Sequence, residues 1–371
     1  MRTTGTAFGV LATISGMSSK SAGELHVTRI NTGVQSNWRF CIAPMMEWTD
    51  RHCRHFHRML APHARLYTEM ISTGALLHGP RERLLKYSAQ QQPVALQLGG
   101  ANPQELAACA RFGADAGFDE INLNVGCPSD RVQHARIGAC LMLEPTLVAE
   151  CVARMRASVE IPITVKCRTG VDDTDGYDFL ARFVATVASA GCDVFIVHAR
   201  KAILSGLTPA QNRSIPPLDW TRVWRLKADY PHLTFVVNGG LDNLGDVREQ
   251  LHGVDGVMLG RASYHNPWLL TELDRALFGR SRGAPVPTTR YEALLQLEPY
   301  IDAEIRAGAR LSDVTRHLLG LFNGCPGARR FRRHLSEHVH RNDAGVDVLL
   351  QAAAHVSELN YEESLAPCSN A

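Results

Sequence analysis

Eight short β-rich segments recur between residues 38 and 260, and this spacing constrains the fold more than any other feature of the sequence. Each segment is bounded by Gly, Pro or Asn. Most are nearly continuous in apolar residues, as is typical of strands that are buried on both faces. The predicted strands are 40–43, 65–68, 94–98, 120–124, 163–167, 194–197, 234–237 and 256–259.

The segments between these strands are long enough for crossover helices, for example 103–116, 144–158 and 178–190. Asn102-Pro103 and Glu144-Pro145 mark two helix starts, because proline fits the first helical turn. Eight βα units over about 240 residues predict a closed (β/α)8 TIM barrel. The alternative is a doubly wound open sheet, which normally has fewer strands and a topological switch point. No G-x-G-x-x-G follows the first strand, which favours the barrel.

A different pattern follows a linker rich in Gly, Pro and Arg at 279–289. The segments 291–307, 311–322, 328–338 and 346–361 predict helices, with no strand candidates between them. We therefore expect the barrel over residues 38–280 and a small all-α helical-bundle domain over 290–365. Gly, Ser and Thr dominate residues 1–37, which are expected to form a disordered leader that contains a second candidate start at Met17.

Composition excludes several classes of protein. The 371 residues carry 39 Lys+Arg against 37 Asp+Glu, so a polyanion site can arise only from local clustering of charge. No stretch of about 18 consecutive apolar residues exists, which excludes a membrane-spanning helix. The 10 cysteines show neither C-x-x-C spacing nor zinc-finger spacing with His. They indicate reduced thiols in the cytoplasm and no metal site.

The chemistry of a TIM barrel lies at the C-terminal ends of its strands, so the residues that close each predicted strand are the candidates for a site. These residues are Pro44, Met45, Met46, Glu69, Gln97, Asn124, Cys127, Lys166, Arg168, His198, Arg200, Lys201, Asn238, Gly239, Gly240, Gly260 and Arg261.

Glycine turns follow the last two strands, at Gly239-Gly240 and Gly260-Arg261. They suit a phosphate, because backbone N–H groups approach closely where no Cβ intervenes. Two ordinary βα turns are the alternative. Lys166 could form a Schiff base, polarise a carbonyl, pair with the anionic edge of a cofactor, or be a solvated lysine. His198 could be a ligand, an acid or a core histidine.

Cys127 lies between Gly and Pro directly after a strand, which indicates a thiol presented on a tight turn at the barrel mouth. Such a thiol is a nucleophile if its pKa is depressed and a proton donor if it stays protonated. No histidine lies beside Cys127 in the sequence that would favour the thiolate form. Most free cysteines are packing residues, and that reading also stands for Cys127 from its residue type alone.

The segment 328–334, Ala-Arg-Arg-Phe-Arg-Arg-His, is the one candidate for a nucleic-acid contact. On a helix, Arg329, Arg332 and Arg333 share one face. Arginines interleaved with an aromatic can follow a phosphate backbone, although a solvated amphipathic helix produces the same pattern.

Several motifs together resemble the tRNA-dihydrouridine synthases, flavoenzymes that reduce uridine in tRNA. The resemblance extends over about residues 38–340. It rests on Ala43-Pro-Met-Met-Glu-Trp-Thr-Asp, Gln97-Leu-Gly-Gly, Asn122-Leu-Asn-Val-Gly-Cys-Pro-Ser-Asp-Arg-Val-Gln, Thr164-Val-Lys-Cys-Arg-Thr-Gly, His198-Ala-Arg-Lys-Ala, Val237-Asn-Gly-Gly and Met258-Leu-Gly-Arg-Ala. The segments from Gly126 and from His198 are similar to the bacterial A subgroup, which modifies positions twenty and twenty-a of the D-loop.

The resemblance implies an NAD(P)-linked oxidoreductase with FMN across the barrel mouth. NADPH would reduce the flavin, which would pass hydride to C6 of the uracil while Cys127 protonates C5. Its implied phosphate-binding residues are Asn238, Gly239, Gly240, Gly260 and Arg261. Its implied contacts to the flavin ring or ribityl chain are Pro44, Met45, Met46, Gln97, Lys166 and His198.

The same resemblance implies that the helical domain holds tRNA while the barrel takes one base, which must leave the folded RNA to reach the flavin. Arg329, Arg332 and Arg333 would hold the backbone, and Asn124, Ala210 and Arg213 would lie where the RNA enters. Ala210 stands where a lysine is common, and Ile137 stands near a place where an aromatic is expected. We expect a cytoplasmic monomer without metal or membrane contact.

Two other functions fit part of the sequence. An FMN barrel that acts on a free pyrimidine-like metabolite, such as a dihydroorotate-oxidising type, would need no arginine-bearing helical domain. A non-catalytic tRNA-binding barrel would need neither flavin nor Cys127.

Overall fold

The computed structural model describes residues 37–129, 136–279, 286–341 and 343–356. The chain divides into two units, residues 1–35 and 36–371, and the described residues all belong to the second. The predicted leader therefore lies outside the described residues, apart from its last residue. The division of the rest into domains at 38–280 and 290–365 stays a prediction.

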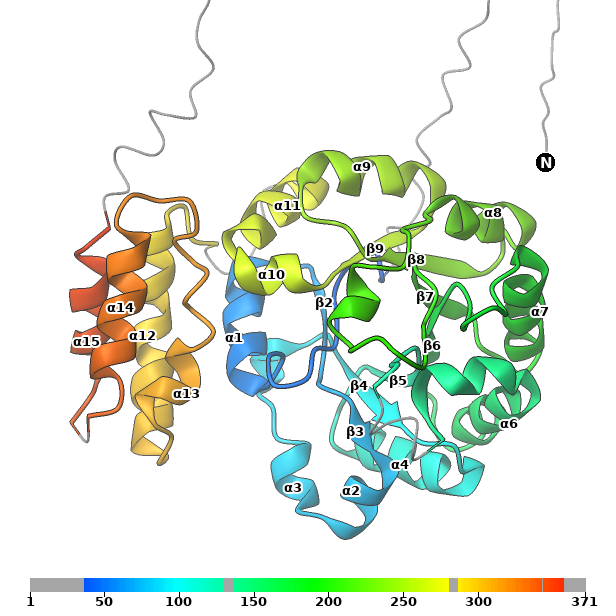
Figure 1. The fold of residues 1–371 in the computed structure, drawn as a ribbon. Helices are drawn as coiled ribbons and strands as arrows, with labels where there is room; N and C mark the ends of the chain where they lie inside the picture. The colour runs from blue at the N-terminus through cyan, green and yellow to red at the C-terminus, as the bar shows by residue number, and fades with distance from the viewer. Residues whose placement is uncertain (1–36, 130–135, 280–285, 342, 357–371) are drawn as a thin grey trace, which may run out of the picture. The chain divides into compact units, whose positions relative to one another are not determined.

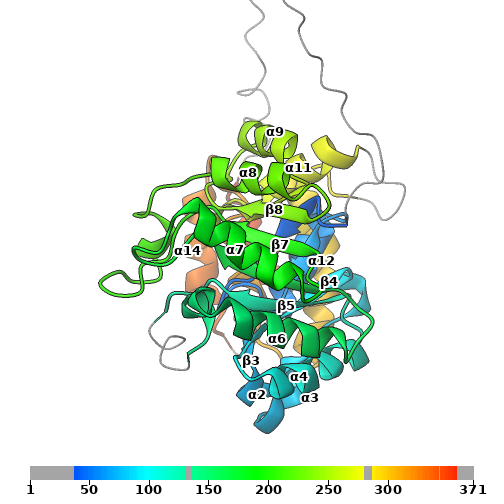
Figure 2. The same ribbon diagram turned by 90° about the vertical axis from the view of Figure 1, so that its right-hand side faces the viewer.

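Eight parallel strands form a closed barrel surrounded by helices, as Figures 1 and 2 show. Neighbours run in the order β2-β1-β9-β8-β7-β6-β5-β4, and pairing of β2 with β4 closes the ring. The strands are β1 (Phe40–Ile42), β2 (Arg65–Tyr67), β3 (Ile71–Ser72), β4 (Val94–Gly99), β5 (Glu120–Val125), β6 (Ile163–Arg168), β7 (Val194–His198), β8 (Thr234–Asn238) and β9 (Gly256–Leu259).

All eight predicted strands are confirmed, each with ends within one residue of the prediction. The closed ring excludes the open doubly wound sheet. The sequence did not predict β3, a two-residue strand that pairs only with β4, through Ile71 opposite Leu98. A segment this short carries no periodic signal that could be recognised.

Helices alternate with the strands around the barrel and continue after it. They are α1 (Arg51–Leu60), α2 (Thr73–His78), α3 (Arg81–Leu84), α4 (Pro103–Asp115), α6 (Pro145–Arg156), α7 (Tyr177–Ala188), α8 (Thr221–Asp229), α9 (Leu244–Gly253), α10 (Arg261–His265), α11 (Trp268–Phe278), α12 (Arg290–Arg306), α13 (Leu311–Thr315), α14 (Ala328–His338) and α15 (Val346–Ala353), with short 3-10 helices η1 (Ala89–Gln91), η2 (Gly138–Leu143) and η3 (Gln211–Arg213).

The starts of α4 and α6 confirm the proline signals in the sequence. Pro103 is the first residue of α4, and the Asn102 side chain accepts hydrogen bonds from two backbone N–H groups of the first turn, at 2.9 and 3.1 Å. These bonds satisfy donors that have no partner within a helix. Pro145 begins α6 in the same way, without a side-chain cap.

The interior of the barrel is apolar on one side and polar on the other. Strands β1, β2 and β7–β9 contribute most of an apolar inner cluster, whereas β4–β6 turn polar side chains inward. The apolar cluster is formed by Cys41, Ala43, Tyr67, Ala95, Val194, Ile196, Val236 and Met258. The buried polar side chains of β4, β5 and β6 are Gln97, Glu120, Asn122, Thr164 and Arg168.

Glu120 is fully buried at the N-terminal end of β5 and is satisfied by four side chains. One carboxylate oxygen accepts from Trp38 Nε1 at 2.7 Å and from Arg65 Nη1 at 3.2 Å. The other accepts from Tyr67 at 2.9 Å and from Thr164 at 2.5 Å. A buried carboxylate is tolerated only when it is paired and hydrogen-bonded, and this arrangement meets that condition.

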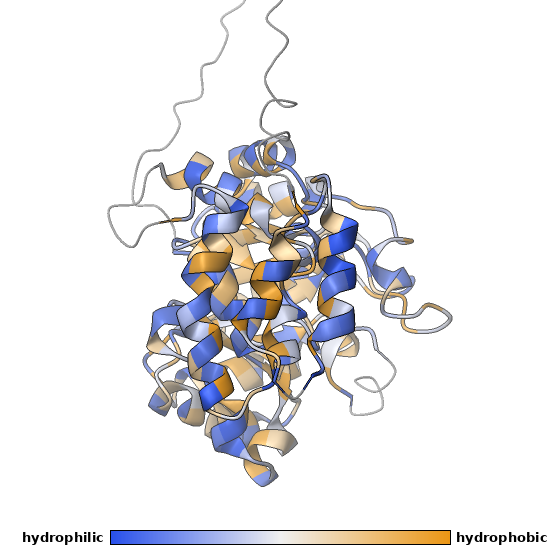
Figure 3. Cartoon of the chain, turned by 90° about the vertical axis from the view of Figure 1, so that its left-hand side faces the viewer, coloured by the Kyte–Doolittle hydropathy of each residue, from blue (hydrophilic) through white to orange (hydrophobic). Residues whose placement is uncertain are grey.

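The helical region, α12 to α15, packs around apolar side chains that belong to the same continuous cluster as the outer core of the barrel, and in it the rings of Phe322 and Phe331 lie with centroids 4.8 Å apart. Each of its helices carries both hydrophilic and hydrophobic residues, as Figure 3 shows. The predicted helices 291–307 and 328–338 are confirmed by α12 and α14. Helix α15 confirms the start of the predicted segment 346–361, whose last five residues lie outside the described residues.

The predicted helix over 311–322 is wrong in length, because only Leu311–Thr315 is helical. Turns follow from Arg316 onward, at the point where the backbone meets α10. A Cβ at Gly320 would lie 2.6 Å from the His265 carbonyl oxygen, so the chain approaches α10 more closely than a side chain would allow. This tertiary contact overrides the local helical pattern.

The helical region meets the barrel through polar contacts between α1 and α12. Arg51 pairs with Glu304 at 2.5 Å, and His52 Nδ1 lies 2.8 Å from the Tyr300 hydroxyl. The His55 ring stacks on Tyr300 with centroids 3.7 Å apart. Burial lowers the pKa of both His52 and His55 to about 4, so the two imidazoles are neutral at pH 7.

No helix in the described part of the chain is long and apolar enough to cross a membrane. The nine cysteines in that part are free thiols.

Replacing Arg65 by Met should leave the Glu120 carboxylate buried without its cation. We expect the variant to lose about 3–5 kcal/mol of unfolding free energy, measured by urea denaturation. The control is Arg341→Met, which removes an exposed pair with Asp343 and should leave the urea midpoint nearly unchanged. Equal midpoints for the two variants would contradict the account of the barrel interior.

Acidification should weaken the contact between α1 and α12. The unfolded chain takes up protons on His52 and His55 near pH 6.5, the folded chain only near pH 4, so the unfolding free energy falls as the pH drops through that window. His55→Gln should therefore give a flatter curve of melting temperature against pH between 4 and 6.5. His232→Gln, at an exposed position, should keep the wild-type slope. Identical slopes in both variants would be inconsistent with a buried neutral His55.

Candidate active site at the barrel mouth

Cys127 lies on a tight turn directly after β5, as the sequence predicts. The side-chain oxygen of Asn124, Oδ1, accepts from the backbone N–H groups of Gly126 and Cys127, at 3.1 and 3.0 Å. Arg168 Nε donates to the Gly126 carbonyl oxygen at 2.8 Å. The half-buried thiol itself donates to Ser129 Oγ at 3.5 Å. The turn is thus held from β5 and from β6, with the thiol at the mouth.

A column of side-chain amides connects this turn to the buried carboxylate below it. Asn124 Nδ2 donates to Gln97 Oε1 at 2.9 Å, and Gln97 Nε2 donates to Asn122 Oδ1 at 2.7 Å. Asn122 Nδ2 then donates to Thr164 Oγ1 at 2.7 Å, and Thr164 donates to Glu120. The predicted roles of Gln97 toward flavin and of Asn124 toward RNA stay predictions. Both side chains already make hydrogen bonds within the column, so each also positions its neighbours.

Lys166 lies two residues before the end of β6 and reaches β8. Its Nζ donates to Asn238 Oδ1 at 3.0 Å, and Asn238 Nδ2 donates to the Met258 carbonyl oxygen at 2.7 Å. Burial, and then the charge of Arg168, lowers the pKa of Lys166 to about 8. An ammonium that is costly to keep charged in this place would be stabilised by an anionic partner.

His198 and the glycine turn after β8 are in direct contact. A Cβ at Gly239 would lie 2.6 Å from His198 Cδ2, and the φ of Gly239 is +105°. Gly240 has a φ of +75°, which is also in the region that favours glycine. Burial, followed by the charges of Arg168 and Lys166, lowers the pKa of His198 well below its usual value. His198 is therefore a neutral imidazole at the mouth.

Arginines gather beside the turn after β9. Arg261 Nη2 donates to the Arg213 carbonyl oxygen at 3.1 Å. Burial, and then the charge of Arg261, lowers the pKa of both Arg200 and Arg213. The buried Nε of Arg200 has no hydrogen-bond partner among the described residues. A Cβ at Gly260 would meet almost nothing, since the nearest atom is Asn238 Nδ2 at 4.0 Å.

This donor set fits an anion. Within the described residues, no carboxylate lies within 4.0 Å of any of the five cations of the mouth, which are Lys166, Arg168, Arg200, Arg213 and Arg261. The open space at Gly260, the unpartnered Arg200 Nε and these unpaired charges together form a cradle for a phosphate.

The loop after β1 contributes the remaining candidates for cofactor contact. Met45 packs against the apolar inner cluster of the barrel, whereas Met46 is exposed over 58% of its surface. Pro44 is half-buried between them and β1. The Met45 N–H donates to Thr49 Oγ1 at 2.9 Å, and the Thr49 hydroxyl donates back to the Met45 carbonyl oxygen. The structure therefore brings apolar surface to the mouth.

The predicted RNA contacts lie in two separate places. Ala210 is exposed beside η3, next to Arg213. On α14, Arg329 and Arg332 line an open hollow of about 620 Å³ that also takes in Arg330 and His355. Arg333 is exposed and pairs with Glu337 at 2.8 Å, so it is the arginine of this set that has a carboxylate partner.

Sequence reasoning missed three features of the site. Arg168 appeared only as a strand-end residue, and its contact with the Gly126 carbonyl oxygen depends on the neighbouring strand. Arg330 was left off the predicted face of α14, yet it lines the same hollow. The third feature is the column of side-chain amides. Its signal in the sequence is the alternation of Glu120, Asn122 and Asn124 along β5, because a period of two places polar residues on one face of a strand.

Known proteins match this chain over most of its length, including the residues of the barrel mouth and of α14. The family model described as dihydrouridine synthase (Dus) matches residues 41–358. A protein of Vibrio cholerae named tRNA-dihydrouridine(20/20a) synthase is 54% identical over 319 residues, covering 86% of this chain and 96% of its own length. A protein of Yersinia pestis with the same name is 55% identical over 325 residues, covering 87% and 93% respectively.

Replacing Asn124 by Ala should release the Cys127 turn, because two backbone N–H groups lose their acceptor. We expect alkylation of Cys127 by iodoacetamide to become several-fold faster, as followed by peptide mass spectrometry. Cys140, which is also half-buried, serves as the internal control and should keep its rate. An unchanged Cys127 rate would show that the turn does not depend on Asn124.

Proposed function

Because this chain belongs to the dihydrouridine synthase family, we propose that it reduces uridines 20 and 20a in the D-loop of tRNA to 5,6-dihydrouridine. The observation that carries the proposal is a match over residues 41–358 that includes both the Cys127 turn and the arginine-bearing α14. The reaction adds one hydride and one proton across the C5–C6 double bond of uracil.

The cofactor in this proposal is FMN, reduced by NADPH. When bound, FMN would supply the hydride that adds to C6 of the base. Arg261 and the backbone at Gly239, Gly240 and Gly260 would hold its phosphate, with Asn238 beside them. Lys166 and the neutral His198 would face the polar side of the flavin ring, with Gln97 below them. Pro44, Met45 and Met46 would supply the apolar surface behind the ring.

Cys127 is the proton donor in this proposal. A thiol that donates a hydrogen bond to Ser129 carries the proton that C5 must receive. Asn124 and Arg168 hold the backbone of the turn from both sides, so the thiol is presented in a defined position. After the reaction, solvent at the half-buried turn returns a proton to the sulfur.

The RNA in this proposal contacts both parts of the described chain. A base can reach the mouth only by leaving the stack of the folded RNA, so the backbone on either side must be held elsewhere. Arg329, Arg332 and Arg333 on α14 would hold that backbone. Asn124, Ala210 and Arg213 would border the entrance to the mouth.

The arginine-lined hollow on α14 favours this function over the reduction of a free metabolite, which gives no reason for arginines gathered on a helix outside the barrel. The enzyme of this proposal is a cytoplasmic monomer.

The purified protein should show a flavin spectrum that NADPH bleaches and that unmodified tRNA restores under anaerobic conditions. Cys127→Ala should bleach normally and recover about 10²- to 10⁴-fold more slowly, since it lacks the proton donor. The control is Cys140→Ala, which removes another half-buried thiol from η2 and should behave like the wild type.

Two results would contradict the proposal. A protein that cannot take up FMN is not a flavoenzyme. A flavin that bleaches but does not respond to tRNA would instead favour a metabolite-reducing barrel.

A further inference from the structure

Asp50 ends the loop after β1 and begins α1. Its side chain accepts hydrogen bonds from the backbone N–H groups of His52 and Cys53, at 2.9 and 3.0 Å. These bonds make it the N-cap of α1, a role that needs only one of its two carboxylate oxygens. The second oxygen is therefore available to another partner.

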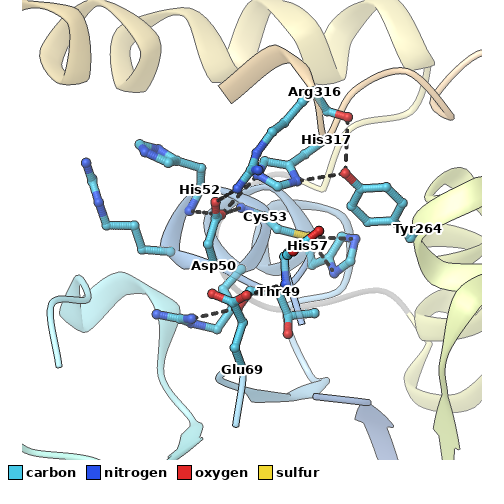
Figure 4. Close-up of polar contacts among 12 residues, drawn as sticks. Thr49, Asp50, His52, Cys53, His57, Glu69, Tyr264, Arg316 and His317 are labelled. Carbon is cyan, nitrogen blue, oxygen red and sulfur yellow. Dashed lines mark hydrogen bonds and ion pairs between the residues drawn. The ribbon is translucent and has the colours of Figure 1, made fainter. Parts of the chain in front are cut away.

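Two side chains of the helical region also bind Asp50, as Figure 4 shows. Arg316 Nη2 donates to Asp50 Oδ2, and His317 Nε2 lies 3.0 Å from Asp50 Oδ1. Burial alone would raise the pKa of Asp50, but hydrogen bonds from His317, from the backbone and from Arg316 outweigh it and hold the pKa well below its usual range. The carboxylate is charged at every pH at which the protein would work.

An aromatic pair extends this junction to α10. The Tyr264 hydroxyl donates to the Arg316 carbonyl oxygen at 3.2 Å and lies 3.2 Å from His317 Nδ1. The Tyr264 ring stacks on Trp48, with centroids 4.3 Å apart and planes inclined by 13°. Trp48 belongs to the same loop as Asp50, so the loop, α10 and the helical region meet around one carboxylate.

The loop between Met45 and Asp50 is short and internally bonded. The Trp48 and Thr49 N–H groups both donate to the Met45 carbonyl oxygen, at 3.1 and 2.9 Å. Arg54 Nη1 fixes the Thr49 carbonyl oxygen at 2.8 Å. A displacement of Asp50 would therefore be passed on to Met45, at the barrel mouth.

On the other side, the chain runs from His317 through turns directly into α14. The Phe322 ring in these turns packs on Phe331 of α14, and Arg290 Nε donates to the Leu321 carbonyl oxygen at 3.0 Å. Through these turns, the arginines of α14 are connected to the same Asp50 carboxylate as the loop that carries Met45.

We propose that Asp50, Arg316 and His317 form a clamp of positioning residues that sets the register between the tRNA-holding helical region and the barrel mouth. This inference rests on the proposed function. The clamp touches neither the base nor the cofactor. It acts by fixing α14 relative to the loop of Pro44–Met46, so that RNA held on one delivers its base to the other.

The polar character of the junction fits such a role. Contacts between parts of a chain that are rich in polar groups permit relative motion unless specific interactions prevent it. The Asp50–Arg316 ion pair is partly exposed, so it adds little net stability, but its geometry specifies one arrangement. The helical region and the barrel also share one continuous apolar cluster, so loss of the clamp should alter the register and leave both parts folded.

The test separates the two half-reactions. Asp50→Asn keeps the shape of the side chain and the cap of α1 but removes the charge that binds Arg316. We expect NADPH to reduce the flavin at the wild-type rate, while reoxidation by tRNA slows about ten- to a hundredfold, the usual cost of a misplaced substrate. Arg316→Gln should give the same result, and Arg316→Lys should restore much of the rate.

The double variant Asp50→Asn/Arg316→Gln should be no slower than either single variant, because both remove the same interaction. Arg310→Gln is the matched control. It breaks an exposed pair with Asp313 on the neighbouring α13 and should leave both half-reactions unchanged.

Three results would overturn the proposal. Wild-type reoxidation in Asp50→Asn and Arg316→Gln would show that the clamp does not set the register. An equal loss of FMN content, thermal stability and both half-reactions would show a structural role only. A wild-type flavin that tRNA fails to reoxidise would refute the proposed function, and the clamp with it.

Discussion

A carboxylate sealed inside a barrel must be satisfied on every side, and in this chain that requirement organises the site. Glu120 is surrounded by Trp38, Arg65, Tyr67 and Thr164, each of which donates to it. Thr164 in turn accepts from Asn122, and the amides above continue upward to the Cys127 turn. Because each donor in the column has one acceptor, the network rigidifies its members. The position of the Cys127 thiol is therefore set from below, through a chain of hydrogen bonds that begins at the floor of the barrel.

The mouth above this column has the opposite electrostatic character. Folding gathers five cations there without a carboxylate beside any of them in the described part of the chain. Burial, and then repulsion between these cations, lowers the pKa values of Lys166, Arg168, Arg200 and Arg213. Burial makes the largest contribution to each of these shifts. Binding of an anion at the mouth would offset the repulsion between these clustered positive charges. A phosphorylated cofactor and an RNA backbone are both anions, so one cluster can serve both steps of the proposed reaction.

The barrel could be predicted because each strand is a local apolar run and several helices start at recognisable caps, such as Asn102-Pro103. The Cys127 turn and the glycine turns were predictable for the same reason, since their signals lie within a few residues. Contacts that depend on neighbouring elements were not. Arg168 meets Gly126 from the next strand, and Arg316 meets Asp50 across 266 residues. The turns after Thr315 replaced a predicted helix because Gly320 had to approach α10. The residues next to each of these positions in the sequence do not indicate such distant partners.

In the proposed reaction, the barrel mouth adds two hydrogen atoms to uridines of the tRNA D-loop. The most direct measurement is mass spectrometry of nuclease fragments from unmodified tRNA after incubation with the enzyme and NADPH. We expect fragments of the D-loop that are heavier by two hydrogen atoms per modified uridine, at positions 20 and 20a. Fragments of unchanged mass, from an enzyme that consumes NADPH equally fast without tRNA, would contradict it.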